Sequence, residues 1–119
     1  MEITLIAKSR MLVMRIYGEI DHHVAGEIRK RVEREIKRTG AINIAFDFGH
    51  VTFMDSSGIG MILGRYKTVQ ALGGYIVIYD ASEQVIRLLE MAGLKNMIIL
   101  SDSLQHGINK INEMKGARV

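Results

Sequence analysis

The stretch Phe53-Met54-Asp55-Ser56-Ser57-Gly58-Ile59-Gly60 joins an expected strand, residues 42–48, to an expected helix, residues 59–72. Asp55 is predicted to be the N-cap of that helix, because its carboxylate can accept hydrogen bonds from the N–H groups of the first turn. Ser56 and Ser57 then fall on the first turn, where a helix carries roughly half a positive charge. An anion attached to either hydroxyl would therefore be stabilised.

Three glycines, at positions 58, 60 and 64, are crowded into the same helix. Each glycine costs about 1 kcal/mol in a helix relative to alanine, so their presence predicts the close approach of another backbone. The apolar spacing predicts a buried face of Ile59, Ile62, Leu63, Tyr66 and Val69. The opposite face, expected to be exposed, carries Ser57, Gly60, Met61, Gly64, Arg65 and Thr68. An exposed Met61 between two glycines would form a shallow, adaptable apolar patch.

The remaining elements follow an α/β order. Strands are expected at 3–7 and 12–17, where they form an antiparallel hairpin, and at 42–48, 75–79 and 97–100. Helices are expected after Asp21 (ending at Gly40), after Asp55, after Asp80 with Glu83, and after Asp102. This order predicts a mixed sheet of four or five strands with an N-terminal hairpin and about four packed helices. We expect one domain, residues 1–119, with 116–119 as a frayed tail.

Composition excludes several kinds of partner. The net charge of +3 comes from 16 basic and 13 acidic residues that are thoroughly mixed, so no nucleic-acid-binding patch is expected. The chain has no cysteine, which removes disulfides and thiolate metal sites. No apolar run is long enough to span a membrane, and Met1-Glu2 does not begin a signal peptide. The cytoplasm is the expected location.

Enzyme motifs are incomplete. The P-loop string Gly-x-x-x-x-Gly-Lys-Ser/Thr is absent, and the third glycine of a Gly-x-Gly-x-x-Gly fingerprint comes one residue late. Gly-x-Ser-x-Gly is also absent, since Asp55 and Gly58 flank the two serines. A small nucleotide-binding or hydrolytic enzyme therefore stands only as the alternative from another functional class, and no cofactor is expected.

The histidines near the first helix do not suggest a metal site. His22 and His23 are adjacent, so on a helix they point about 100° apart and cannot readily chelate one ion. They are interpreted as polar residues of the first turn. Asp21 is interpreted as an N-cap that could also contact a partner, and Arg65 as a solvated helix residue.

Two segments carry a resemblance to a known family: Gly18-Glu19-Ile20-Asp21-His22-His23 and the run from Phe53 to Tyr66. The chain resembles, from end to end, the anti-sigma factor antagonists built on a STAS domain, especially the sporulation members that act on the anti-sigma F factor. Its net basic charge departs from the acidic members of that family.

The resemblance implies a phosphorylation switch. Ser56 would be the phosphoacceptor, and the kinase would be the anti-sigma factor, which holds the ATP. The unphosphorylated form would bind that factor and release the sigma factor, and a protein serine phosphatase would reset the switch. An antagonist in another partner-switching pathway, such as general stress, is the alternative within the fold. The family's contact positions correspond to Glu19, Asp21, His22, Ser57, Gly60 and Arg65, and the local chemistry adds Asp55, Met61 and Gly64.

Overall fold

Five strands form one mixed sheet whose spatial order, β1-β2-β3-β4-β5, is also their order along the chain. β1 pairs antiparallel with β2, and every later pairing is parallel. The computed structural model describes residues 1–116. Its elements are β1 (Glu2–Ile6), η1 (Ala7–Ser9), β2 (Met11–Ile20), α1 (His22–Thr39), β3 (Asn43–Met54), α2 (Ser56–Ala71), β4 (Ile76–Tyr79), α3 (Glu83–Met91), β5 (Ile99–Ser101) and α4 (Leu104–Gly116).

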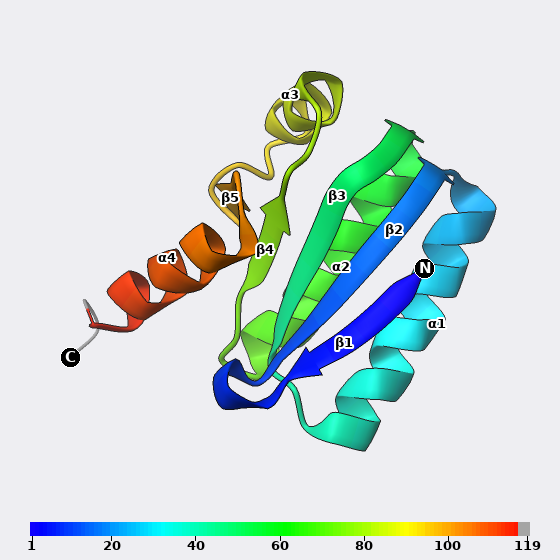
Figure 1. The fold of residues 1–119 in the computed structure, drawn as a ribbon. Coiled ribbons are helices and arrows are strands. Elements are labelled where there is room, and N and C mark those ends of the chain that lie inside the picture. The colour runs from blue at the N-terminus through cyan, green and yellow to red at the C-terminus, as the bar shows by residue number, and fades with distance from the viewer. Residues whose placement is uncertain (117–119) are drawn as a thin grey trace.

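The predicted α/β class, the N-terminal hairpin and the four helices are confirmed (Figure 1). Gly116 belongs to α4, and residues 117–119 of the expected frayed tail lie outside the described residues.

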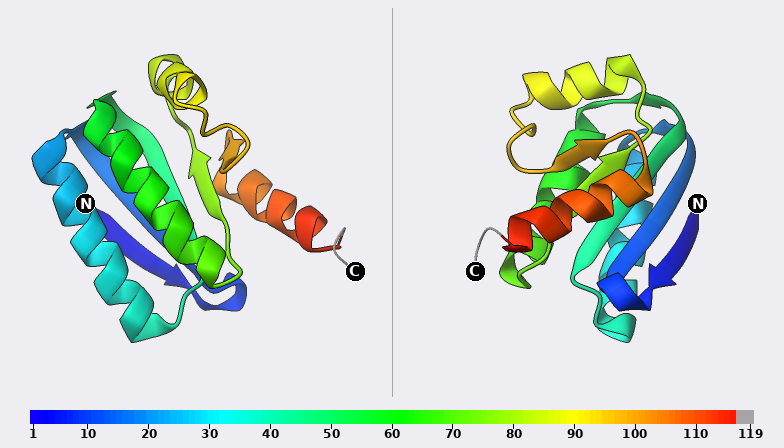
Figure 2. Two further views of the ribbon diagram at one scale, coloured as in Figure 1. Left: turned by 180° about the vertical axis from the view of Figure 1, so that it is seen from behind. Right: turned by 60° about the vertical axis from the view of Figure 1, so that its left-hand side comes forward.

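Helices cover both faces of the sheet, but unequally. α1 and α2 lie side by side on one face, whereas α4 lies on the other (Figures 1 and 2). Strand side chains alternate between these faces, so Phe46 and Ile78 join the main core while Ala45 and Val77 join a smaller core beneath α4. Gly107 lets α4 come close to β4, because a Cβ there would lie 2.4 Å from a methyl carbon of Val77.

The central strands are longer than predicted. The expected strands 12–17 and 42–48 are in fact β2, to Ile20, and β3, to Met54. Gly18 does not end β2. It lies inside the strand, next to a register shift, and takes a positive φ of 82° there. β3 contains two bulges, each with one more residue than the facing part of β2. The first lies between the pairs Arg15↔Asp47 and Tyr17↔His50. The second follows the pair Gly18↔Val51.

These two bulges change the burial period of β3. Phe48, Val51 and Met54 all enter the main core although they are three residues apart, because each bulge inserts one residue between them. A search of the sequence for apolar residues at every second position cannot identify such a strand. The consequence for function is that β3 carries the chain to Met54, directly before Asp55.

Helix ends were predicted with mixed success. Asp21 and Asp55 are N-caps, and Gly40 is the left-handed C-cap of α1, as expected. The predicted Asp80–Glu83 capping box is wrong: Ser82 caps α3, while Asp80 takes a left-handed conformation with φ 59°. The hydroxyl of Ser103, rather than Asp102, accepts the hydrogen bond at the start of α4.

The faces of α2 also differ from the prediction. Ile62 and Val69 are buried as expected, but Met61 and Arg65, which were expected to be exposed, are each only 5% exposed. The reason is that α2 packs against α1 as well as the sheet, so its covered surface is wider than one apolar stripe. The sequence pattern identified the contact with the sheet and missed the contact with α1.

Candidate functional site

Two helices begin at the same edge of the sheet. Ile20 and Met54 are register partners at the ends of the parallel strands β2 and β3, and the backbone N–H of Asp55 donates to the carbonyl of Ile20 at 3.3 Å. The Asp21 carboxylate accepts from the N–H of Val24 at 2.9 Å, and the Asp55 carboxylate accepts from that of Ser57 at 2.8 Å. The positive ends of the α1 and α2 dipoles therefore lie next to each other.

The two serines of α2 differ in exposure. Ser56 is the first residue of α2 and is exposed, whereas Ser57 is half-buried with its backbone N–H bound to the cap. Gly58 is required by the tight turn from β3, because a Cβ at this position would lie 2.3 Å from Cγ of Met54. Ser56 is thus the more accessible hydroxyl, at the end of a helix that favours negative charge.

An open groove of about 600 Å³ runs between α1 and α2. We call it the α1–α2 groove. A Cβ added to Gly60 or Gly64 would meet no atom of the described residues within 4 Å, so both glycines leave open space. Six of the predicted site residues line this groove: His22, Ser57, Gly60, Met61, Gly64 and Arg65.

The other four predicted site residues lie outside the groove lining. Asp21 and Asp55 cap the two helices at its end, and Ser56 is exposed at the start of α2. Glu19 is exposed near the end of β2, on the same edge of the sheet. The structure therefore groups all ten predicted residues around two helix starts and the groove between the helices.

Arg65 is the unusual charge of the groove. Its Nη2 lies 3.4 Å from Oε1 of Glu33, and within the described chain its Nε and Nη1 are buried without a hydrogen-bond partner. Burial lowers the pKa of Arg65 from its ordinary value, and the Glu33 carboxylate opposes that shift. A buried guanidinium with free donors can bind an anionic or carbonyl group that enters the groove.

On the α1 side of the groove, His22 was the only lining residue predicted from the sequence, and Gly26, Arg29 and Lys30, which also line it, were missed. Gly26 was the available signal: a glycine in the middle of a helix, with nothing within 4 Å of its missing side chain, makes that surface smooth. Phe53 was also missed. It is 53% exposed just before the cap, which makes it an apolar contact residue next to the site.

Metal binding finds no support in residues 1–116, which contain no group of three or more potential metal-ligating side chains. His23 instead lies 2.9 Å from Glu27 along α1. Over the same residues, no helix has the length and apolar character needed to cross a membrane.

Residues 2–107 match the STAS domain family, and the chain therefore belongs to that family. An anti-sigma F factor antagonist from Paenibacillus polymyxa is 35% identical over 105 residues, which cover 88% of this chain and 87% of that protein. An anti-sigma-B factor antagonist from Bacillus subtilis (strain 168) is 32% identical over 93 residues, covering 78% and 84%. These relatives are regulatory proteins rather than enzymes, in agreement with the incomplete enzyme motifs.

A solved structure of SpoIIAA gives the same fold. The phosphorylated form of this Bacillus cell-fate determinant aligns with a TM-score of 0.72 at 25% identity, covering 92% of this chain and 97% of that one. The unphosphorylated form of SpoIIAA also aligns with a TM-score of 0.72, at 24% identity and with 97% of each chain covered.

Proposed function

We propose that this chain is an anti-sigma factor antagonist whose binding is switched off by phosphorylation of Ser56. The observation that carries the proposal is the position of Ser56, exposed at the first turn of a capped helix and next to the α1–α2 groove. The relatives named as antagonists of anti-sigma factors support it. The partner is an anti-sigma factor that is also the kinase and carries the ATP.

The partner-binding surface comprises the α1–α2 groove and the two helix starts. Gly60 and Gly64 let a partner approach the backbone of α2, and Arg65 lines the groove with two buried donors that have no hydrogen-bond partner in the described chain. The complete set is Glu19, Asp21, His22, Asp55, Ser57, Gly60, Met61, Gly64 and Arg65.

Phosphorylation acts at the interface rather than on the fold. A phosphate adds about −1.5 to −2 charges, and the start of α2 accommodates it locally. Burying that dianion against a partner costs several kcal/mol unless it is paired, and each 1.4 kcal/mol weakens affinity tenfold. The TM-score of 0.72 with both forms of SpoIIAA fits a switch that keeps the fold. A protein serine phosphatase restores the binding form.

The anti-sigma F pathway of sporulation is the proposed setting, because the 35% identical relative is named an anti-sigma F factor antagonist. A second candidate is the pathway of the anti-sigma-B relative, at 32% identity. The two are separated by measuring binding and phosphorylation with an anti-sigma F kinase and an anti-sigma-B kinase in parallel. The cognate kinase is the one that binds the unphosphorylated chain more tightly and modifies it.

The central experiment follows phosphate incorporation from labelled ATP. We expect none with the chain alone and one phosphate on Ser56 when the kinase is added. Ser56→Ala should stay folded and bind the kinase without release, whereas Ser56→Asp should bind at least tenfold more weakly. Ser57→Ala is the matched control and should still be phosphorylated.

Two results would overturn the proposal. If Ser57→Ala alone lost phosphate uptake, Ser57 and not Ser56 would be the phosphorylated residue. Turnover of nucleotide by the chain without a kinase would favour the enzyme alternative.

A further inference from the structure

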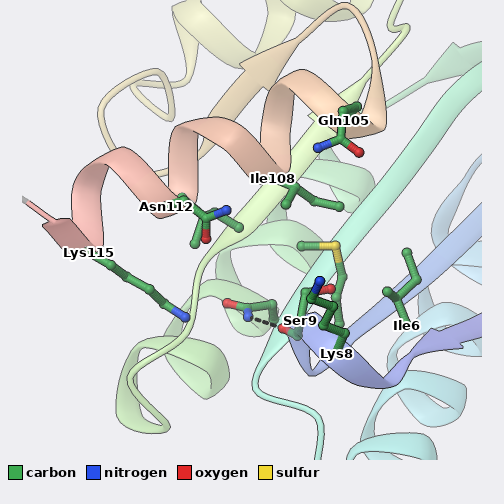
Figure 3. Close-up of a pocket in the computed structure, with 10 residues that line it drawn as sticks. Ile6, Lys8, Ser9, Gln105, Ile108, Asn112 and Lys115 are labelled. Carbon is green, nitrogen blue, oxygen red and sulfur yellow. Dashed lines mark hydrogen bonds between the residues drawn. The ribbon is translucent and has the colours of Figure 1, made fainter.

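A second cavity lies on the sheet face opposite the α1–α2 groove, between the η1 turn and α4 (Figure 3). Its volume of about 380 Å³ lies in the range of small-molecule binding sites. We call it the α4 cavity. α4 packs on β4 and β5, and the cavity lies between α4, from Gln105 to Lys115, and residues 6–11 of the N-terminal hairpin.

The inner wall of the α4 cavity is apolar. Met11 and Ile111 are buried, and Ile6 and Ile108 are half-buried around them. Ile108 and Ile111 are three residues apart on α4, so they present one continuous face. An alkyl chain of a ligand would be removed from water by contact with this wall.

The charges that line the α4 cavity are both positive. Lys8 comes from the η1 turn and Lys115 from the last turn of α4, and among residues 1–116 no acidic side chain lines the cavity. Within residues 1–116 neither lysine forms an ion pair. Figure 3 shows Lys115 extending from α4 toward the turn that carries Ser9. Two unpaired cations beside one cavity favour an anionic ligand.

A buried hydroxyl adds a hydrogen-bond donor. Ser9 lines the cavity, and in the described chain its Oγ is buried without a hydrogen-bond partner. Asn43 is already committed: its Nδ2 donates to the Ser9 carbonyl at 2.9 Å and its Oδ1 accepts from the N–H of Tyr75 at 2.7 Å. Because buried polar groups are nearly always paired, the Ser9 hydroxyl is a spare donor next to the cavity, and it reaches a ligand oxygen only if the Ser9 side chain rotates toward the cavity.

We propose that the α4 cavity binds a small amphiphilic monoanion, namely a saturated monocarboxylate of medium chain length. The alkyl chain contacts Met11 and Ile111, and the carboxylate lies between Lys8 and Lys115 with Ser9 as a donor. The cavity lining runs along α4 from Gln105 to Lys115, and Lys115 lies in the last turn, where the helix dipole opposes additional negative charge. A single carboxylate therefore fits better than a phosphate dianion.

The test is a titration of the full chain with octanoate, followed by methyl NMR signals of Met11, Ile108 and Ile111. We expect saturable shifts at these residues and affinity that rises about fourfold per methylene from butanoate to octanoate. Octylamine, octanol and inorganic phosphate should each bind about tenfold more weakly or not at all. Absence of saturable shifts at millimolar octanoate, or shifts confined to the α1–α2 groove, would overturn the proposal.

Variants separate the charge from the apolar wall. The double variant Lys8→Met/Lys115→Met should weaken octanoate binding about tenfold, while Lys110→Met, an exposed lysine of α4 that does not line the cavity, should leave it unchanged. Ile108→Phe narrows the cavity and should abolish octanoate binding with the spectrum of the fold retained. Equal octanoate affinity in the double variant and in Lys110→Met would contradict the role of the two lysines.

Discussion

Arg65 is a cation held between α2 and α1 with fewer hydrogen-bond partners than its guanidinium can use. Within residues 1–116 only Nη2 approaches a carboxylate, that of Glu33 at 3.4 Å, and Glu33 is itself about half exposed. Removing a buried charge from water costs several kcal/mol, and one long contact recovers little of it. We infer that Arg65 lowers the stability of the free chain and is retained for what enters the groove.

Arg65→Met tests this inference. Methionine keeps the length and apolar stem of the side chain without its charge, so we expect the free energy of unfolding to stay within about 1 kcal/mol of wild type or to rise. Binding to the anti-sigma kinase should fall at least tenfold, as measured by calorimetry. The control is Arg34→Met, an exposed arginine of α1 outside the groove lining, which should change neither quantity. A loss of several kcal/mol in Arg65→Met would show that the arginine supports the fold.

At the scale of the element, α2 combines weak intrinsic helix preference with a smooth surface. Gly60 and Gly64 face open space in the groove, so no neighbour among residues 1–116 explains why they are glycines. Gly58 is different, since its missing side chain makes room for Met54. The three glycines of α2 are therefore explained by two different requirements: room for a side chain of this chain at Gly58, and a smooth open surface at Gly60 and Gly64.

Gly60→Ala and Gly64→Ala should each raise the free energy of unfolding by about 0.5–1 kcal/mol, because alanine loses less conformational entropy in a helix and meets no clash here. The same methyl groups fill the α1–α2 groove, so kinase binding should weaken. Urea unfolding and calorimetry measure the two effects. As a contrast, Gly74→Ala should be strongly destabilising, because its Cβ would lie 1.7 Å from the carbonyl oxygen of Ile42. Tighter kinase binding by Gly60→Ala would refute the docking role.

Local capping chemistry predicted the start of the site well. Asp55 and Asp21 needed only the rule that a carboxylate before an apolar helix accepts first-turn N–H groups. The second half of β3 could not be predicted, because its two bulges replace a period of two by a spacing of three between Phe48, Val51 and Met54. Burial of Met61 could not be predicted either, since it depends on α1, which lies more than 20 residues earlier in the chain.

For the whole molecule, one contribution to stability at high pH comes from Tyr79, which packs against the smaller core beneath α4. Tyr79 is half-buried there, and burial raises its pKa, with the nearby Asp47 carboxylate adding to the shift. The folded chain therefore holds the phenol proton to higher pH than the unfolded chain does. The resulting stabilisation is complete below the unfolded pKa of about 10 and is lost as pH rises through the folded value.

We therefore expect the free energy of unfolding to fall between pH 9 and 11, and to fall less in Tyr79→Phe, because phenylalanine has no proton to lose. Denaturant titrations across that range measure the difference between the two profiles. Parallel profiles for wild type and Tyr79→Phe would mean that Tyr79 does not contribute to the pH dependence.

The order of strands and helices was predictable at this scale because each strand and helix has its own periodicity and glycine punctuation. The placement of the helices on the two faces of the sheet was not predictable. Nothing in the pattern of residues 104–111 indicated that α4 would lie alone on its face or leave the α4 cavity beside Met11. Such features arise from the distances between elements, which single-segment patterns do not contain.

The identity of strand order and chain order has a consequence for biosynthesis. Each strand after β1 pairs with the strand that was translated just before it. A nascent chain leaving the ribosome can therefore extend the sheet one strand at a time, with every hydrogen-bonding partner already outside the exit tunnel. The groove between α1 and α2 can be completed while later residues are still being synthesised, whereas the cavity that α4 closes must wait for the last helix.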